Sequence, residues 1–335
     1  MARRDPPPLR FGAALFGDLS DLENGRDVAW RSRVFALPLL NSCNSKLPLL
    51  SSCCPERSTV FCEAVYRRIG VATTFSPRFL AVLAEAARIS RLFDSPLHLI
   101  HAAEEEPEKL SRFNAALQVL DLPPGSPIHF ERGEPAEAIL RVQQEHQIEL
   151  LIAGALERES LHRNFTGDVA RRLLVEAPCD LLLFVEPEER AVPPNQIFVA
   201  IPDFSPFSRE TFLRSTAFAE KVGAHEVTLL HVQSTFAEAK EKALGNEPPL
   251  VEDALNDWAS NRPSSAINLD SHSVRGNTGF TACEFIQSSD ANLLVLPSHL
   301  GHPNLPVFAP VLDWILQVIP TNLWVMRQVG EPVSV

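Results

Sequence analysis

Residues 68–77 read Arg-Ile-Gly-Val-Ala-Thr-Thr-Phe-Ser-Pro, a short apolar run followed by a polar turn. Beyond the turn, apolar residues recur at the spacing of a helix, so the stretch predicts a strand, a turn and a helix. Ser76 is placed to cap that helix, and Pro77 suits its first position, where a backbone N–H would have no partner. The same order returns at residues 197–206, Ile-Phe-Val-Ala-Ile-Pro-Asp-Phe-Ser-Pro. The chain therefore carries two copies of one unit.

Four pairs of landmarks align the two copies, with an offset that grows by 13 positions partway along the unit. One duplication, followed by an insertion around the second helix of the second copy, explains this change. The pairs are Phe75 with Phe204, His101 with His231, Arg132 with Arg275 and Leu151 with Leu294, at offsets of 129, 130, 143 and 143.

In the first copy, apolar strands alternate with helices, which predicts an α/β fold with a parallel sheet covered on both faces. We expect two tandem five-stranded domains, at residues 66–187 and 196–329, joined by a polar, Pro-rich linker at 188–195. Strands are expected near 69–73, 97–101, 128–132, 150–153 and 181–186, and helices near 77–93, 107–120, 135–146 and 167–176.

The first 65 residues follow no sustained helical or strand period and are rich in Pro, Ser, Arg and Cys. We expect this extension to be disordered. Clear pattern begins abruptly at Val65, and no methionine lies between Met1 and Met326. The hypothesis that follows is that translation starts near Val65 at a non-ATG codon.

The charge and the cysteines exclude several classes of function. Lys+Arg 30 against Asp+Glu 42 gives a net charge of -12, which opposes binding to nucleic acids and to anionic membrane surfaces. No apolar run approaches the roughly 20 residues of a membrane-spanning helix. The six cysteines form no CxxC pair, so a reduced, cytoplasmic protein without a cysteine zinc site is expected.

Four short segments of the first copy carry a recognisable pattern: Gly133-Glu134-Pro135-Ala136, Ala153-Gly154, Gly167-Asp168-Val169-Ala170 and Ala177-Pro178-Cys179-Asp180. In order and spacing they resemble the domains of universal stress proteins. In that family the sheet order is 3-2-1-4-5, and the resemblance implies a ligand site where the winding reverses, between strands one and four. ATP-binding members place adenine at an Asp after strand one and phosphates on a glycine loop after strand four.

The resemblance implies a candidate site for ATP or another adenine nucleotide, with altered chemistry. Glu157 replaces the second glycine of the loop, and a carboxylate near a phosphate costs about 3 kcal/mol. In the second copy, Pro297 and Pro310 occupy the positions of the loop glycines, and proline has no N–H to donate. The candidate residues are Thr73, Thr74, Phe75, Ser76, Gly154, Arg158, Thr166, Gly167 and Asp168 in the first copy, and Asp203 and Ser205 in the second.

Other candidate residues favour structural roles. His299 and His302 have a spacing that suits two metal ligands, but no third ligand is evident nearby, so a polar loop is expected. His101 and His231 end strands that face the reversal point, where strand-end hydrogen bonds or a ligand contact would satisfy them. Cys179 and Cys283 are expected to be small buried hydrophobic residues.

The leading interpretation is a non-enzymatic stress or regulatory protein in which the two copies pair within the chain. The family commonly dimerises through its final strands, so Leu181–Glu186 and Asn322–Met326 are the expected contact, within one chain or between copies of it. The alternatives are an adenine-nucleotide switch in the first copy and an enzyme of the nucleotide-binding α-hydrolase group. The sequence motifs of that group's pyrophosphatases and synthetases are not found in this chain.

Overall fold

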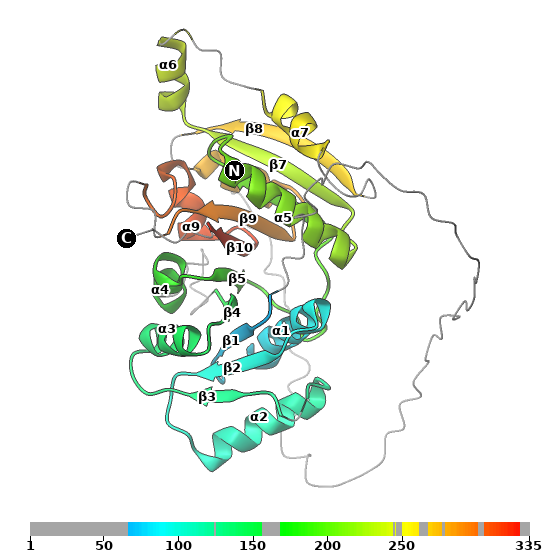
Figure 1. The fold of residues 1–335 in the computed structure, drawn as a ribbon, viewed down its shortest axis with the longest axis vertical. Helices are drawn as coiled ribbons and strands as arrows, with labels where there is room; N and C mark the ends of the chain where they lie inside the picture. The colour runs from blue at the N-terminus through cyan, green and yellow to red at the C-terminus, as the bar shows by residue number, and fades with distance from the viewer. Residues whose placement is uncertain are drawn as a thin grey trace, which may run out of the picture. The chain divides into compact units, whose positions relative to one another are not determined.

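The computed structural model describes residues 66–123, 125–155, 168–243, 245, 250–260, 267–276, 279–300 and 305–328. The extension at 1–65 lies outside the described residues. Among those described, ten strands form one sheet in the order β3-β2-β1-β4-β5-β10-β9-β6-β7-β8 (Figure 1). The strands are β1 Ile69–Thr73, β2 Leu97–His101, β3 Ile128–Phe130, β4 Leu150–Gly154, β5 Asp180–Phe184, β6 Gln196–Ile201, β7 Glu226–Gln233, β8 Asn268–Arg275, β9 Leu293–Ser298 and β10 Asn322–Arg327.

The neighbouring strands pair in parallel except β5 and β10, which pair antiparallel through Leu181–Leu183 and Leu323–Val325. The prediction of an α/β fold is confirmed, and the sheet is mostly parallel. The sheet does not break between the two expected domains, because the β5–β10 ladder continues the hydrogen bonding from one half to the other.

Helices cover both faces of the sheet, and each face has one apolar core that spans the two halves (Figure 1). One core includes Val82, Phe113 and Phe212, and the other includes Ile139, Leu173 and Ile315. The helices are α1 Phe79–Phe93, α2 Pro107–Val119, α3 Pro135–Glu145, α4 Asp168–Glu176, α5 Pro206–Val222, α6 Thr235–Ala243, α7 Val251–Ala259, α8 Phe280–Ser288 and α9 Asp313–Val318, with a 3₁₀ turn, η2, at Pro310–Leu312. Where the first half has α2 between its second and third strands, the second half has α6 and α7, as the expected insertion requires.

The start of α3 follows the predicted Gly-Glu-Pro-Ala pattern. Gly133 has a φ of 128°, which a side chain would disfavour, and it turns the chain into the helix. The carboxylate of Glu134 accepts the N–H groups of Ala136 and Glu137 at 3.2 and 3.1 Å, while Pro135 takes the first helical position. The segment is therefore a capped helix start.

The predicted start of α1 is wrong. The helix begins at Phe79 and has no side-chain cap, while the carbonyl of Ser76 accepts the N–H of Phe79 at 3.0 Å in a turn. The reason lies in the spacing between the strand and Phe-Ser-Pro: Thr73 and Ile201 pair with equivalent histidines, yet only Thr74 separates Thr73 from the following Phe. In the second half Pro202 and Asp203 separate Ile201 from Phe204, and that extra residue brings a serine to the capping position.

The end of β9 also differs from expectation. Pro297 and Ser298 were expected in the loop after the fourth strand of the second copy, but both belong to β9. They remain in the strand because they pair with Met326 and Arg327 of β10. The loop starts at His299.

A buried polar cluster crosses the junction between the halves. Asp180, at the start of β5, is 5% exposed, and its carboxylate accepts hydrogen bonds from the Tyr66 hydroxyl and the Arg214 guanidinium. It also accepts the backbone N–H of Arg327 at 2.7 Å. Burial and then the charge of Asp180 raise the pKa of Tyr66 well above its usual value. This cluster, here called the Asp180 cluster, ties β5 to α5 and β10.

Among the described residues, no helix combines the length and the apolar character that a membrane span needs.

Candidate functional site

The candidate site of the first half lies at the carboxyl ends of β1 and β4. These two strands pair in parallel, so Thr73 and Gly154, at their last positions, open onto the same edge of the sheet. Thr74, Ser76 and Gly154 are exposed. The structure thus brings together the candidate residues 73–76 and Gly154. Arg158, Thr166 and Gly167 lie outside the described residues.

The turn after β1 is occupied by contacts within the protein. The Thr73 hydroxyl donates to the carbonyl of Ile100 at 2.9 Å, and Nδ1 of His101 donates to the carbonyl of Thr73 at 3.0 Å. The Phe75 ring packs 4.8 Å from His101, centroid to centroid. The guanidinium of Arg112 lies 4.0 Å from the centre of the Phe75 ring, a cation–π contact. The prediction of a strand-end hydrogen bond is confirmed for His101.

Two features at the phosphate side bear on anion binding. Asp168 is the first residue of α4, so its carboxylate lies in the first turn, where the positive end of a helix would otherwise attract a phosphate. A Cβ added to Gly154 would lie 3.5 Å from Val82, an ordinary contact. Packing therefore does not require glycine at that position.

In the second half, the equivalent turn is held by Asp203. Its Oδ1 accepts the N–H of Ser205 at 3.0 Å and the hydroxyl of Ser208 at 2.8 Å. Burial alone would raise the pKa of Asp203, but these hydrogen bonds and His299 nearby hold the pKa below its usual value. The hydroxyl of Ser205 caps α5 by accepting the Ser208 N–H at 3.2 Å. Both candidate residues of the second half thus stabilise the turn itself.

The aromatic pair of the first half recurs in the second. Phe204 lies 4.5 Å from His231 between ring centroids, as Phe75 lies against His101. His231 is 7% exposed, and burial lowers its pKa despite the opposing charge of Asp203. In both halves, this phenylalanine–histidine pair packs the turn after the first strand against the second strand.

The end of β9 is occupied by Arg327. Its guanidinium donates to the hydroxyl of Ser298 and, at 2.7 Å, to the carbonyl of Leu174. Burial lowers the pKa of Arg327 to about 10. The backbone N–H of His299 donates to the backbone carbonyl of Val307 at 2.9 Å, so that N–H is not free for a phosphate. His302, the other half of the expected pair, lies outside the described residues.

The two cysteines that the structure describes agree with the prediction. Cys179 and Cys283 are 8% and 2% exposed, and burial raises the pKa of each thiol to about 12. They are therefore unreactive thiols near neutral pH.

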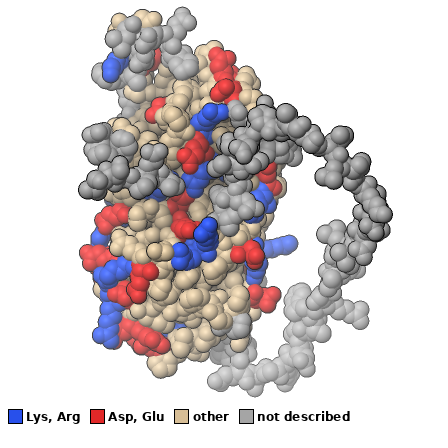
Figure 2. All heavy atoms as spheres, viewed as in Figure 1, with Lys and Arg blue, Asp and Glu red and all other residues tan. Residues whose placement is uncertain are grey.

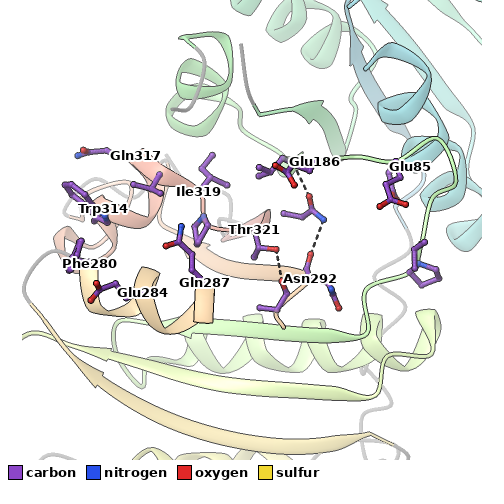
Figure 3. Close-up of a pocket in the computed structure, with 18 residues that line it drawn as sticks. Glu85, Glu186, Phe280, Glu284, Gln287, Asn292, Trp314, Gln317, Ile319 and Thr321 are labelled. Atoms are coloured by element: carbon purple, nitrogen blue, oxygen red, sulfur yellow. Dashed lines mark hydrogen bonds between the residues drawn. The ribbon is translucent and has the colours of Figure 1, made fainter. Parts of the chain in front are cut away.

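A cavity of about 790 Å³ lies between the linker, α1, α8 and α9, and none of the candidate residues named above lines it (Figure 3). In the second half it opens at the amino ends of the strands, since Asn292 precedes β9 and Asn322 begins β10. Figure 3 shows Phe280, Glu284 and Trp314 at one end and Glu85 at the other. Burial raises the pKa of Glu85 even though Arg88 opposes the shift. The acidic lining, which also includes Glu186 and Glu188, repels phosphates.

Sequence reasoning missed this cavity. Its lining residues come from segments far apart in the chain, and none of them forms a local motif. Only the folded arrangement brings four carboxylates to one surface, those of Glu85, Glu186, Glu188 and Glu284.

Comparisons with known proteins agree with the predicted resemblance over the first half. Residues 65–184 match the model of the Universal stress protein family, and no curated protein sequence matches the chain. Several solved structures share the fold over a longer range. A protein of unknown function from Pseudomonas aeruginosa PAO1 has a TM-score of 0.59 at 17% identity, covering 78% of this chain and 92% of its own.

Two further structures cover the same share of this chain. A putative universal stress protein from Pseudomonas aeruginosa UCBPP-PA14 has a TM-score of 0.58 at 18% identity, with 93% of its chain covered. A universal stress protein from Archaeoglobus fulgidus DSM 4304 has a TM-score of 0.56 at 12% identity, with 98% covered. At these identities the likeness shows the fold alone. It extends well beyond the residues that the family model matches.

Proposed function

We propose that the chain is a non-enzymatic, cytoplasmic stress-response or regulatory protein of the universal stress protein type, built as an internal pair. The observation that carries the proposal is the antiparallel pairing of β5 with β10. On either side of it the strands follow one order, β3-β2-β1-β4-β5 and β8-β7-β6-β9-β10, so each half corresponds to a five-stranded 3-2-1-4-5 unit.

The pairing supports a scaffold because it covers two strand edges that would otherwise be exposed. An unpaired edge exposes backbone N–H and C=O groups that attract other chains. In this chain the backbone groups of β5 and β10 form hydrogen bonds with each other, and the Asp180 cluster adds side-chain hydrogen bonds across the same junction. One chain thereby supplies both members of the pair.

The same proposal includes degenerate nucleotide sites. In the second half, Asp203 is bonded within its own turn and Pro297 stands at the position of the loop glycine. In the first half, Arg112 covers Phe75 and Asp168 places a carboxylate at the start of α4. Each of these features weakens phosphate or adenine binding.

The second candidate function is an adenine-nucleotide switch in the first half. It is favoured by Thr74, Ser76 and Gly154, which are exposed at the ends of two neighbouring strands. Calorimetric titration of the purified full chain with ATP and with AMP separates the two candidates. The scaffold predicts no saturable heat up to about millimolar nucleotide, whereas saturable binding that Gly154→Val abolishes would establish the switch.

The stress-response role needs a test in cells. Deletion of the gene should lower survival in stationary phase or starvation, and the full chain should restore it. A copy carrying Trp324→Asp, which places a charge in the junction, should fail to restore survival, while Arg171→Ala, at an exposed position of α4, should succeed. Normal survival of the deletion strain under all stresses would contradict the proposal.

A further inference from the structure

Three histidines from separate segments meet on the face of the sheet that α3 covers. His98 lies in β2, His129 lies in β3, and His146 follows the last residue of α3. One ring nitrogen from each lies within 4.8 Å of the others, and Nδ1 of His98 is 3.0 Å from Nε2 of His129. All three side chains are partly buried.

The strand register brings His98 and His129 to one face. Ile100 pairs with His129 across the parallel β2–β3 ladder. Because alternate residues of a strand point to the same face, His98 lies on the face of Ile100 and therefore of His129. Their rings stack at 7° with centroids 5.2 Å apart.

The third histidine reaches them because Gly70 lies beneath the turn that follows α3. Gly70 is the β1 partner of His98, and a Cβ added to it would lie 2.7 Å from Cδ1 of Ile148. Gln147 has a φ of 50°, which turns the chain down onto β1 between His146 and Ile148. The glycine thus allows the turn to approach the sheet and places the His146 ring 4.0 Å from that of His129.

The second half shows that the fold does not need all three histidines together. At the equivalent positions, by strand register and helix end, it has Phe198 for Gly70, Thr228 for His98 and Ser289 for His146. Phe198 packs against Phe285 at 5.9 Å, so an aromatic ring stands where the glycine leaves room. His272 alone is retained, and it pairs with Asp270 at 3.0 Å. The complete set of three histidines is therefore specific to the first half.

Imidazole nitrogens at this spacing suit a transition-metal ion. In a tetrahedral site with metal–nitrogen bonds of about 2.0–2.1 Å, two ligand nitrogens stand about 3.3 Å apart. We propose that His98, His129 and His146 bind one divalent transition-metal ion of the Zn²⁺ class, with the fourth position open to water. The site lies on the α3 face of the sheet and uses none of the residues 73–76 or 154.

One electrostatic feature of the cluster favours binding of a cation and another opposes it. Burial, with the nearby His146 and His98, lowers the pKa of His129 to about 4, and burial, followed by His146, also lowers the pKa of His98. Neutral rings offer lone pairs without first releasing a proton. Arg68 lies close enough to His98 to contribute to that shift, and its charge also opposes a cation. The metal–nitrogen bonds must therefore supply the affinity.

The test uses the full chain without a polyhistidine tag, titrated with Zn²⁺ alone. We expect one Zn²⁺ per chain, and His146→Gln or His129→Gln should weaken binding at least tenfold, as loss of a ligand does. The matched control is His272→Gln, the equivalent of His129 in the second half, which should bind as the unaltered chain does. Thermal melting in EDTA checks that each variant folds, and Zn²⁺ should raise the melting temperature only where the site is intact.

Because the chain has six cysteines, the ligand atoms must be identified as well. X-ray absorption at the zinc edge should show nitrogen or oxygen neighbours and no sulfur. Sulfur neighbours, binding that both histidine variants leave unchanged, or no binding at all would overturn the proposal.

Discussion

Gly279 and Gly223 both have left-handed backbone angles, with φ of 79° and 71°, but their surroundings differ. A Cβ added to Gly279 would lie 2.5 Å from the backbone oxygen of Val311, whereas one added to Gly223 would meet nothing within 4 Å. Alanine at either site costs about 1 kcal/mol for the backbone angle alone. At Gly279 the clash with backbone adds about 1–3 kcal/mol.

We therefore predict that Gly279→Ala lowers the free energy of unfolding by about 3 kcal/mol and Gly223→Ala by about 1 kcal/mol. Urea denaturation followed by circular dichroism measures both variants. Equal losses would mean that the approach of Val311 to Gly279 does not constrain the fold.

Asp203 gives a prediction on pH. Its folded pKa lies below the usual 3.8, because hydrogen bonds from Ser205 and Ser208 outweigh burial. The unfolded chain therefore binds the proton first as the pH falls, and the stabilisation is full above pH 3.8 and is lost through the folded pKa. Asp203→Asn should be less stable than the unaltered chain at pH 7, and the gap should close below pH 3.8. A gap that stays constant with pH would exclude this role for the charge.

At the scale of elements, the same tripeptide, Phe-Ser-Pro, leads into two helices in different ways. Ser205 accepts the Ser208 N–H and Pro206 takes the first position of α5, whereas Ser76 lies in a turn three residues before α1. Ser205→Ala should lower the free energy of unfolding by about 1 kcal/mol, the usual cost of a lost cap. Ser76→Ala is the matched control and should change it little. Denaturant titration of the two variants decides, and a larger loss at Ser76 would contradict the assigned cap.

Hydrophobic periodicity predicted nearly every strand and helix of the first half, because the sheet is buried on both faces and its apolar runs are continuous. The position of Ser76 could not be predicted, since one residue separates β1 from its Phe-Ser-Pro segment whereas two separate β6 from the second one, and nothing local shows where each strand ends. The candidate residues 73–76 and 154 were proposed because they lie at the ends of two strands and in the turn after one of them, where the resemblance implies a ligand. His98, His129 and His146 were not found, because strand register and Gly70 bring them together.

At the scale of the whole molecule, charge is mixed over the described surface seen in Figure 2, where acidic and basic side chains alternate. A net charge of -12 is thus not gathered into one patch on that face. The feature that unites the molecule is the junction of β5 and β10. The Asp180 cluster and both apolar cores cross it, so the halves should unfold together.

Trp324 tests that cooperativity. The side chain, in β10, is 3% exposed, lies 4.7 Å from Phe218 of α5 and 6.4 Å from Tyr66 of the first half, between ring centroids. Trp324→Ala should lower the free energy of unfolding by about 3–5 kcal/mol, as loss of a buried tryptophan does. Because the lost contacts join the halves, hydrogen exchange in β1–β4 and in β6–β9 should report one opening free energy before the change and two after it.

The matched control is Trp314→Ala, since Trp314 is partly exposed beside Phe280 and lies away from the junction. Trp314→Ala should lower the free energy of unfolding by less than Trp324→Ala does, and the two halves should still report a single opening free energy. If Trp324→Ala lowers stability while the two halves still open together, the junction is not what couples them. The coupling would then reside in the apolar core beneath α1 and α5. There the rings of Phe93 in α1 and Phe218 in α5 stack with their centroids 6.3 Å apart.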